Sequence, residues 1–428
     1  MSMTSPEAEP VAAGERQQQA TQADTPTADQ SNGPLQGLKI LDISTVVAAP
    51  WSATLLADLG AEVLKAELPG TGDPLRALPP HKEGVPLWWK VTNRNKQGIT
   101  LDLRKPEGKA LFEKLLPRFD VLVENFRPGT LANWGLPSER LFALQPKLIV
   151  MRMTGFGQTG PYRNKPGFAR TFEAMSGFTN MCGEANGPPL HLGFPIADAV
   201  AGLFGAIGIL AALRHRLEHP EAPGQEIDCS LFESMFRVLD FMPIEYDQLG
   251  LVRGRSGSFS QYAAPGNIYR TKEGHWASIA ASTQSIYVRL CQAIGREDLV
   301  SDERFASNQT RVVHRDALDA IISAEVGART MSELRELLDG NEVGFSPVYT
   351  VEDVFDDPQV EARDAIVSVA DEQLGPLRMQ GVVPKFSRTP GSVVHAGPAL
   401  GQHNRQIYQD LLGLTDAEIE RLRGLGAI

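Results

Sequence analysis

The sequence predicts an α/β fold, with a doubly wound parallel sheet in a large domain beside a smaller α/β domain. Short apolar strand segments alternate with helical segments from residue 38 to about 236. This alternation is typical of a parallel sheet with helices on both faces. Near residue 250 the pattern changes, because a Gly- and Ser-rich stretch (253–267) precedes a second group of shorter elements.

The expected elements follow from apolar spacing and from start and stop residues. Strands are expected at 38–44, 62–68, 99–103, 120–126 and 148–155. Helices are expected over 49–59, after Pro106 and after Ser138. The second part predicts a strand at 275–281, helices near 283–294, 315–325 and 330–338, and a capped helix within 415–426. Ligands of such a sheet are expected at the carboxyl ends of its strands.

Composition divides the chain further. Residues 1–33 contain no aromatic residue and Arg16 as their one basic side chain, so they predict a disordered tail without targeting features. We expect a large domain over 35–235, to which 370–428 returns, and a small domain over 255–345. Residues 236–254 and 346–369 are interpreted as connectors.

Charge and cysteine content exclude several classes of protein. The net charge of −11 argues against a nucleic-acid-binding protein. The three cysteines (182, 229 and 291) form no CxxC pair, so neither a disulfide framework nor a zinc site is indicated, and a cytoplasmic location is expected. Residues 196–213 barely reach the length of a membrane span and carry Asp198, which favours a buried core helix and no membrane contact.

Common catalytic motifs are missing from the sequence. It has no GxxxxGK[ST] loop, no GxGxxG after the first strand, no GxSxG elbow and no HExxH pair. The informative region is instead 154–213, where a Gly-Pro loop leads to the apolar helix predicted from Pro195.

Asp198 is the candidate catalytic residue of this region. It falls in the first turn of the predicted helix, where free amides and the helix dipole favour an ionised carboxylate. Gly202, Gly205 and Gly208 along the same helix permit close approach of another backbone or of a ligand. From the local residues, Asp198 is either a helix-stabilising acid or a nucleophile.

Eight segments, in order, resemble the class III coenzyme A (CoA) transferases of the CaiB–BaiF type. This family includes formyl-CoA transferase, carnitine CoA-transferase and the 2-methylacyl-CoA racemases. The segments include NRNKQGITLDLRKPEG (93–108), VLVENFRPGTLANWG (121–135), GFGQTGP (155–161) and IADAVAG (196–202). The others lie at 38–76, 173–178, 224–235 and 384–391, so the resemblance runs from about residue 35 to the end.

The resemblance implies roles for particular residues. Asp198 matches the family's nucleophile, which forms a mixed anhydride with the donor acyl group and then an aspartyl-CoA thioester. The CoA thioester is a substrate, and neither a metal nor a permanently bound cofactor is implied. The family's CoA contacts map onto three segments that contain Val46, Val47 and Ala48, then Leu101 and Arg104, then Asn125, Phe126 and Arg127.

Some positions depart from the family pattern. Val47 stands where a polar residue, often Gln, is usual, and Leu68 and Asn133 replace two arginines of formyl-CoA transferase. Phe168 and Ala169 replace the His–Asp pair of the racemases, which removes one of the two acid/base groups that racemisation needs.

Three functions therefore remain, with CoA transfer first. The leading function is transfer of CoA from an acyl-CoA, such as succinyl-CoA, to a carboxylic acid. The alternatives are an acyl-CoA racemase or isomerase, and a weakly active subunit of a hetero-oligomeric CoA-transferase. The resemblance further implies an interlocked homodimer, with a homologous second subunit as the other arrangement. Glu173 is expected as a polar neighbour of the site, and the loop around Gly254–Gly257 as its cover.

Overall fold

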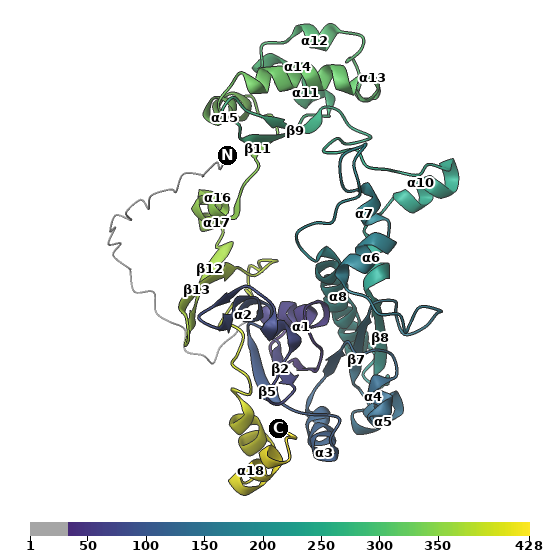
Figure 1. Cartoon of the computed structure of the whole chain (residues 1–428), viewed down its shortest axis with the longest axis vertical. Coiled ribbons are helices and arrows are strands. Elements are labelled where there is room, and N and C mark those ends of the chain that lie inside the picture. Colours follow the sequence, from purple (N-terminus) through teal and green to yellow (C-terminus); the bar gives the residue numbers. More distant parts are fainter. Residues whose placement is uncertain (1–32) are drawn as a thin grey trace, which may run out of the picture.

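A six-stranded parallel sheet forms the centre of the larger part of the chain (Figure 1). The computed structural model describes residues 33–428, so the tail predicted over 1–33 lies, apart from Gly33, outside them. The strand order is β5-β2-β1-β6-β7-β8, and every neighbouring pair is parallel. The strands are β1 (Lys39–Asp42), β2 (Glu62–Glu67), β5 (Lys96–Thr100), β6 (Val121–Glu124), β7 (Ile149–Thr154) and β8 (Gln225–Ser230).

This order is that of a doubly wound sheet, which reverses direction between β1 and β6. Strands after β1 are added on one side of it, and those from β6 onward on the other. In open α/β sheets, ligands bind at the carboxyl ends of the strands where the order reverses. The loops after β1 and β6 are therefore the first place to look for a site.

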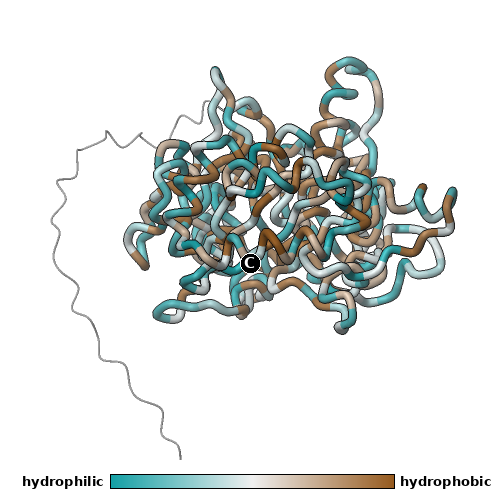
Figure 2. Tube along the Cα trace, turned by 90° about the horizontal axis from the view of Figure 1, so that it is seen from above, coloured by the Kyte–Doolittle hydropathy of each residue, from teal (hydrophilic) through white to brown (hydrophobic). Residues whose placement is uncertain are grey.

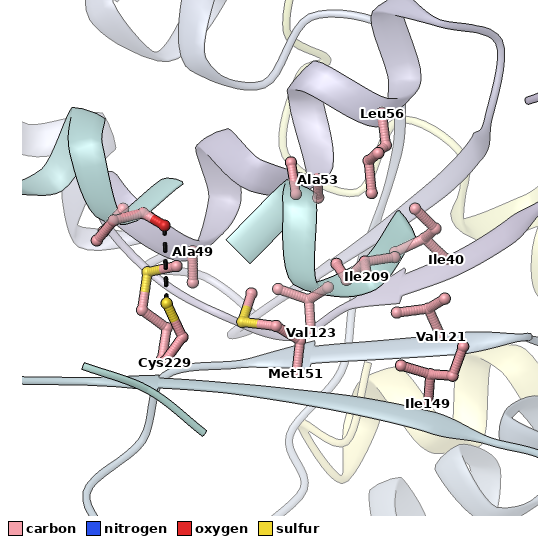
Figure 3. Close-up of a cluster of buried hydrophobic side chains, with 14 of the residues drawn as sticks. Ile40, Ala49, Ala53, Leu56, Val121, Val123, Ile149, Met151, Ile209 and Cys229 are labelled. Atoms are coloured by element: carbon pink, nitrogen blue, oxygen red, sulfur yellow. Dashed lines mark hydrogen bonds between the residues drawn. The ribbon is translucent and has the colours of Figure 1, made fainter. Parts of the chain in front are cut away.

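Helices cover both faces of the sheet. One face packs against α1 (Ala48–Asp58), α8 (Ile196–Glu218) and α9 (Leu231–Arg237), and the other against α3 (Pro106–Leu115), α5 (Ser138–Leu144) and α18 (Asp416–Gly424). Alternate strand residues serve the two cores: Ile40 faces the first and Leu41 the second. Figure 3 shows Ile40, Val121 and Met151 of the first core beside Ala53 of α1 and Ile209 of α8.

Four predicted strands are confirmed, whereas the one predicted at 99–103 is displaced toward the N-terminus. β5 covers Lys96–Thr100, because Lys96 is fully buried and its Nζ lies 2.9 Å from Oδ2 of Asp42. A paired lysine inside a strand does not give the apolar pattern on which the prediction relied.

The sixth strand, β8, was missed. It carries Gln225, Glu226 and Asp228 along the open edge of the sheet, where polar side chains reach solvent. An edge strand of this composition lacks the apolar run expected of a buried parallel strand.

The smaller part has its own sheet and core. Its three strands are antiparallel, in the order β11-β10-β9, and its helices pack on them around a separate set of buried residues. The strand predicted at 275–281 and the helices predicted near 283–294, 315–325 and 330–338 are confirmed. The elements are β9 (Gly266–Arg270), β10 (Trp276–Ala280), α11 (Gln284–Ala293), α12 (Asp298–Ser301), α13 (Asn308–Val313), α14 (Arg315–Gly327), α15 (Met331–Gly340) and β11 (Phe345–Pro347).

Two stretches link the parts, and the ribbon therefore outlines a ring around an opening in Figure 1. The outgoing stretch contains α10 (Met242–Leu249), and the returning one contains α16 (Val351–Asp356), α17 (Pro358–Ala362) and the hairpin β12 (Ile366–Asp371)–β13 (Gly375–Gln380). The final residues hydrogen-bond to the sheet-bearing part, for example from His403 N to Gly98 O and from Asp102 N to Ala427 O. The predicted capped helix is α18, and its N-cap residue is Thr415. The Thr415 hydroxyl accepts a hydrogen bond from Glu418 N, and the Glu418 carboxylate accepts one from Thr415 N.

The remaining elements are short. They are η1 (Pro74–Ala77), β3 (His81–Lys82), β4 (Val85–Pro86), α2 (Leu87–Thr92), η2 (Leu116–Arg118), α4 (Thr130–Asn133), α6 (Ala169–Met175), α7 (Phe178–Met181) and η3 (Gln406–Leu411).

The long apolar helix α8 is less buried than the sequence suggested. Its inner residues pack on the sheet, but Leu203, Ile207 and Leu210 are exposed on its outer side. Within residues 33–428 it is the one helix long and apolar enough to span a membrane, and 44% of its apolar window is buried. Figure 2 likewise shows apolar segments at the outline of the molecule as well as inside it.

Candidate active site

Asp198 lies in the first turn of α8, as the sequence predicts. The helix begins at Ile196, after Pro195, which has no side chain able to cap it. Asp198 is therefore the third helical residue and lies at the end of α8 nearest the carboxyl ends of the strands. Its side chain is half-buried.

Gly202 and Gly205 bring α8 close to α1, and the expected approach to another backbone is confirmed at Gly202, whereas Gly208 faces the side chain of Ile227. A Cβ added at Gly202 would lie 3.1 Å from the backbone oxygen of Ala48, at the start of α1. At Gly205, it would lie 2.8 Å from Met153 and 3.1 Å from Ser52. This close contact sets Asp198 beside the loop that leads from β1 into α1.

A cavity of about 280 Å³ opens at Asp198. Six of the eight predicted CoA contacts line it, and they come from the loops after β1 and β6, on either side of the point where the strand order reverses. These six residues are Val46, Val47, Ala48, Asn125, Phe126 and Arg127. Thr154 at the end of β7 and Arg163 and Lys165 of the following loop add further walls.

Hydrogen bonds join the two loops across the reversal point. The Asn125 side chain accepts from Thr45 N at 2.8 Å and donates to Thr45 O at 2.7 Å. Asn125 thus mimics a neighbouring strand and fixes the loop after β1. Asn125 therefore lies at the site, as predicted, and also holds the loop after β1 in place.

Val46 is held in a conformation that a β-branched residue rarely adopts. Its φ is +68°, in the left-handed region. Its backbone N–H donates to both carboxylate oxygens of Asp73, at 3.0 and 3.2 Å. Strained backbone of this kind persists where the surroundings fix it, and it is often found at functional sites.

A buried group of charges, which the apolar patterns of the sequence do not predict, lies beneath this loop. Lys65 Nζ lies 3.5 Å from Asp42 and 3.4 Å from Asp73, and Lys96 also pairs with Asp42. All four side chains are buried, and burial lowers the pKa of Lys96 to about 8. A lysine in the middle of the apolar strand 62–68 was the available signal.

The other two predicted CoA contacts, Leu101 and Arg104, line an adjoining cavity of about 540 Å³. The two cavities share Thr45 and Phe126. Leu68 and Trp134 add apolar walls to the second cavity. The two cavities therefore adjoin at these shared residues, and Asp198 lines the smaller one.

Arg104 is engaged within the protein. Its Nε and Nη2 donate to the two oxygens of Asp102, each at 2.8 Å, and this bond lowers the pKa of the Asp102 carboxyl. The Arg104 side chain remains 55% exposed. A phosphate at this rim would share Arg104 with Asp102.

The electrostatics of Asp198 differ from the expectation. Burial, together with the negative charge of Glu173, raises the pKa of Asp198 to about 7. The expected effect of the helix start is therefore not the deciding one, because loss of water and a like charge move the pKa of Asp198 in the opposite direction. Glu173, expected as a polar neighbour, acts on Asp198 through its charge.

The remaining expectations concern the flanking loops. Phe168, 80% exposed, lines the cavity, and Ala169 starts α6, so neither offers an acid/base group. The loop around Gly254–Gly257 does not line this cavity; Gly257 N instead donates to Gly183 O at 3.0 Å. Within the described part of the chain, no cluster of three or more His, Cys, Asp and Glu residues could hold a metal ion.

Comparison with known proteins decides the family. The sequence model of CoA-transferase family III matches residues 35–404. The chain belongs to CoA-transferase family III.

Curated relatives of this family III chain have related names. It is 44% identical to the succinyl-CoA–D-citramalate CoA-transferase of Chloroflexus aurantiacus, over 91% of this chain and 97% of the relative. It is 41% identical, over the same shares, to the beta subunit of the succinyl-CoA–L-malate CoA-transferase of that organism. The family III chain is therefore an enzyme that transfers CoA.

A solved structure supports the same fold. A CaiB/BaiF family protein from Brucella suis has a TM-score of 0.79 and 33% identity, covering 89% of this chain and 100% of that one. The predicted α/β fold and the predicted family are thus both confirmed.

Proposed function

We propose that this family III enzyme moves CoA from succinyl-CoA to a dicarboxylic acid through a covalent intermediate on Asp198. One observation carries the proposal: Asp198 shares a cavity with the loops after β1 and β6, at the reversal point of the sheet. The names of its relatives support succinyl-CoA as donor and a dicarboxylic acid as acceptor.

The reaction divides into balanced steps. The ionised Asp198 attacks the thioester carbonyl and expels CoA thiolate, which leaves an aspartyl–acyl mixed anhydride. The thiolate attacks the aspartyl carbonyl, releases the donor acid and leaves an aspartyl-CoA thioester. The acceptor carboxylate reverses both steps and regenerates Asp198. Such covalent catalysis replaces one difficult exchange by easier ones.

The cations around the cavity support an anionic acceptor. Arg127, Arg163 and Lys165 line the cavity that contains Asp198. A dicarboxylic acid uses one carboxylate in the reaction and keeps a second, which guanidinium and ammonium groups bind well. By contrast, Phe168 and Ala169 provide no second base for racemisation.

A transfer assay with a panel of acceptors tests the proposal. The purified chain is incubated with succinyl-CoA and citramalate, malate, glutarate, acetate or butyrate, and the CoA thioesters are identified by mass spectrometry. We expect dicarboxylate thioesters to form at least about tenfold faster than monocarboxylate ones, because the second carboxylate can pair with the cations of the cavity. A tenfold difference in rate corresponds to about 1.4 kcal/mol.

Two substitutions complete the assay. Asp198→Asn should lower the rate of CoA transfer by at least about 10³-fold. Asp416→Asn removes an exposed acid in the first turn of α18 and should leave transfer unchanged. Exchange of the α-hydrogen of an acyl-CoA without CoA transfer would instead support a racemase or isomerase.

We further propose a soluble, cytoplasmic oligomer, either a homodimer or a pair with a homologous subunit. The exposed apolar side of α8 and the unburied helix α10 support an interface. The relatives that are named as subunits support the paired arrangement. Activity of the chain expressed alone would favour the homodimer, and activity that requires a homologous chain would favour the pair.

A further inference from the structure

Glu173 is a buried acid beside the first turn of α8. It is the fifth residue of α6, and none of its surface is exposed (0%). A carboxylate removed from water is costly unless it is hydrogen-bonded or paired. Its partners therefore define what it does at this position.

The first partner is the backbone of α8. Glu173 Oε1 accepts from Ala197 N at 3.4 Å, and Ala197 directly precedes Asp198. This amide belongs to the first turn, where helices have no partner of their own to offer. Since Pro195 contributes no side-chain cap, Glu173 caps α8 from a different helix.

The second partner is His191. Its Nδ1 lies 3.3 Å from Glu173 Oε2, and among the ion pairs of residues 33–428 this is the one that involves Glu173. His191 belongs to the segment 182–195, which connects α7 to α8, and its side chain is 34% exposed. The buried acid is thus linked to a histidine that solvent reaches.

The two acids, Glu173 and Asp198, influence each other because they carry like charges. Burial and the charge of Glu173 together raise the pKa of Asp198 to about 7. His191 Nδ1, 3.3 Å from Glu173 Oε2, is the side chain placed to offset that charge. The ionised, reactive form of Asp198 is then easier to reach.

Other charged groups near α8 do not replace this pair. Arg152 of β7 is engaged with Glu124 and Glu226, and α1 carries no charged residue before Asp58. The remaining charged groups of the packed elements and cavity loops are Arg170, Asp228, Glu233, Arg237, Arg127, Arg163 and Lys165. Among all these groups, Glu173 is the one whose charge shifts the pKa of Asp198.

We propose that Glu173 is a positioning residue for Asp198 and that His191 is the cation that balances its charge. The inference rests on the proposed role of Asp198 as nucleophile and adds two residues that act through it. Glu173 fixes the first turn of α8, and His191 limits the electrostatic cost of doing so with a charged group. Loss of His191 leaves Glu173 unbalanced and favours the protonated, unreactive form of Asp198.

The test measures the ionisation of Asp198 without any substrate. Diazo compounds esterify protonated carboxyl groups, so peptide mass spectrometry after brief labelling of the intact protein between pH 4 and 9 gives a midpoint for Asp198. We expect a wild-type midpoint near 7. Glu173→Gln keeps an oxygen for Ala197 N but removes the charge, and should lower the midpoint by about one unit.

His191→Gln should raise the midpoint, and it changes a partly exposed residue, so the proposal stays testable if Glu173→Gln fails to fold. Glu233→Gln, on α9, removes an exposed acid near α8 and should leave the midpoint unchanged. An unchanged midpoint in Glu173→Gln would overturn the role of Glu173, and an unchanged or lower one in His191→Gln that of His191. Failure of CoA transfer would refute the proposed function separately, because labelling does not depend on turnover.

Discussion

At the scale of single residues, Asp198 combines a position that sequence reveals with an environment that it hides. The spacing Pro195–Asp198 was enough to put the acid in a first helical turn. Its raised pKa depends on burial and on Glu173, which lies 25 residues earlier in the chain and meets Asp198 only after folding. Local sequence gives helix contacts, but not the neighbours that two separate helices bring together.

The same reasoning predicts an effect of pH on stability. Native Asp198 keeps its proton up to about pH 7, whereas the unfolded residue loses it near 3.8. The native state therefore binds more protons in this window, and the free energy of unfolding falls as the pH rises through it. Asn cannot ionise, so Asp198→Asn should be more stable than the wild type at pH 8, by roughly 1–2 kcal/mol.

Urea unfolding at pH 4.5 and pH 8 measures this difference. The gain should be smaller at pH 4.5, where the wild-type carboxyl is still mostly protonated in the native state. A variant that is less stable than the wild type at both values would show that Asp198 helps α8 more than its burial costs.

At the scale of elements, apolar patterns predicted the strands that fill the cores, but they misplaced or missed the strands that carry charged side chains. The strands at 38–44, 62–68, 120–126 and 148–155 were found because their residues fill the two cores. β5 was displaced and β8 was missed because Lys96 is ion-paired and the edge strand is polar. The buried ion pairs of Lys65 beneath Val46 were not predicted for the same reason. The acids that make a buried lysine tolerable are distant from it in sequence.

The α1–α8 contact gives a prediction at this scale. A methyl group at Gly202 would meet the backbone of Ala48, which cannot move aside, whereas at Gly208 it would meet the side chain of Ile227. We expect Gly202→Ala to lower the free energy of unfolding by about 1–3 kcal/mol. Gly208→Ala should be neutral or stabilising by up to about 1 kcal/mol, because alanine favours the helix.

Chemical denaturation of the two variants, made side by side, distinguishes packing from helix propensity. Equal stabilities would mean that α8 shifts freely against α1. In that case the contact would not fix the position of Asp198.

At the scale of the whole molecule, the ribbon outlines a ring around an opening (Figure 1), and apolar segments lie at the outline of the molecule as well as inside it (Figure 2). Leu203, Ile207 and Leu210 on the outer side of α8 are exposed in the single chain. Exposed apolar patches of this kind commonly mark protein–protein contacts. The sequence showed an apolar helix but not which side faces outward, since nearly every position of that helix is apolar.

A dimer is therefore expected in solution, and Ile207→Glu should raise the fraction of monomer. Sedimentation velocity at low micromolar concentration measures it, with Val313→Glu as a control that alters an exposed apolar residue of the smaller part. A wild-type chain that sediments as a monomer would contradict the homodimer and leave the pair with a homologous subunit. Equal effects of the two variants would mean that the outer side of α8 is not special.

The most direct test of the central claim is to identify the residue that carries the acyl group. The enzyme is mixed with succinyl-CoA, quenched with hydroxylamine and digested, and the peptides are mapped by mass spectrometry. Hydroxylamine converts an activated aspartyl group to a hydroxamate, so we predict this modification on Asp198, dependent on succinyl-CoA and unaffected by Asp416→Asn. A modification on another residue, or CoA transfer that persists in Asp198→Asn, would contradict the assignment of Asp198 as the nucleophile.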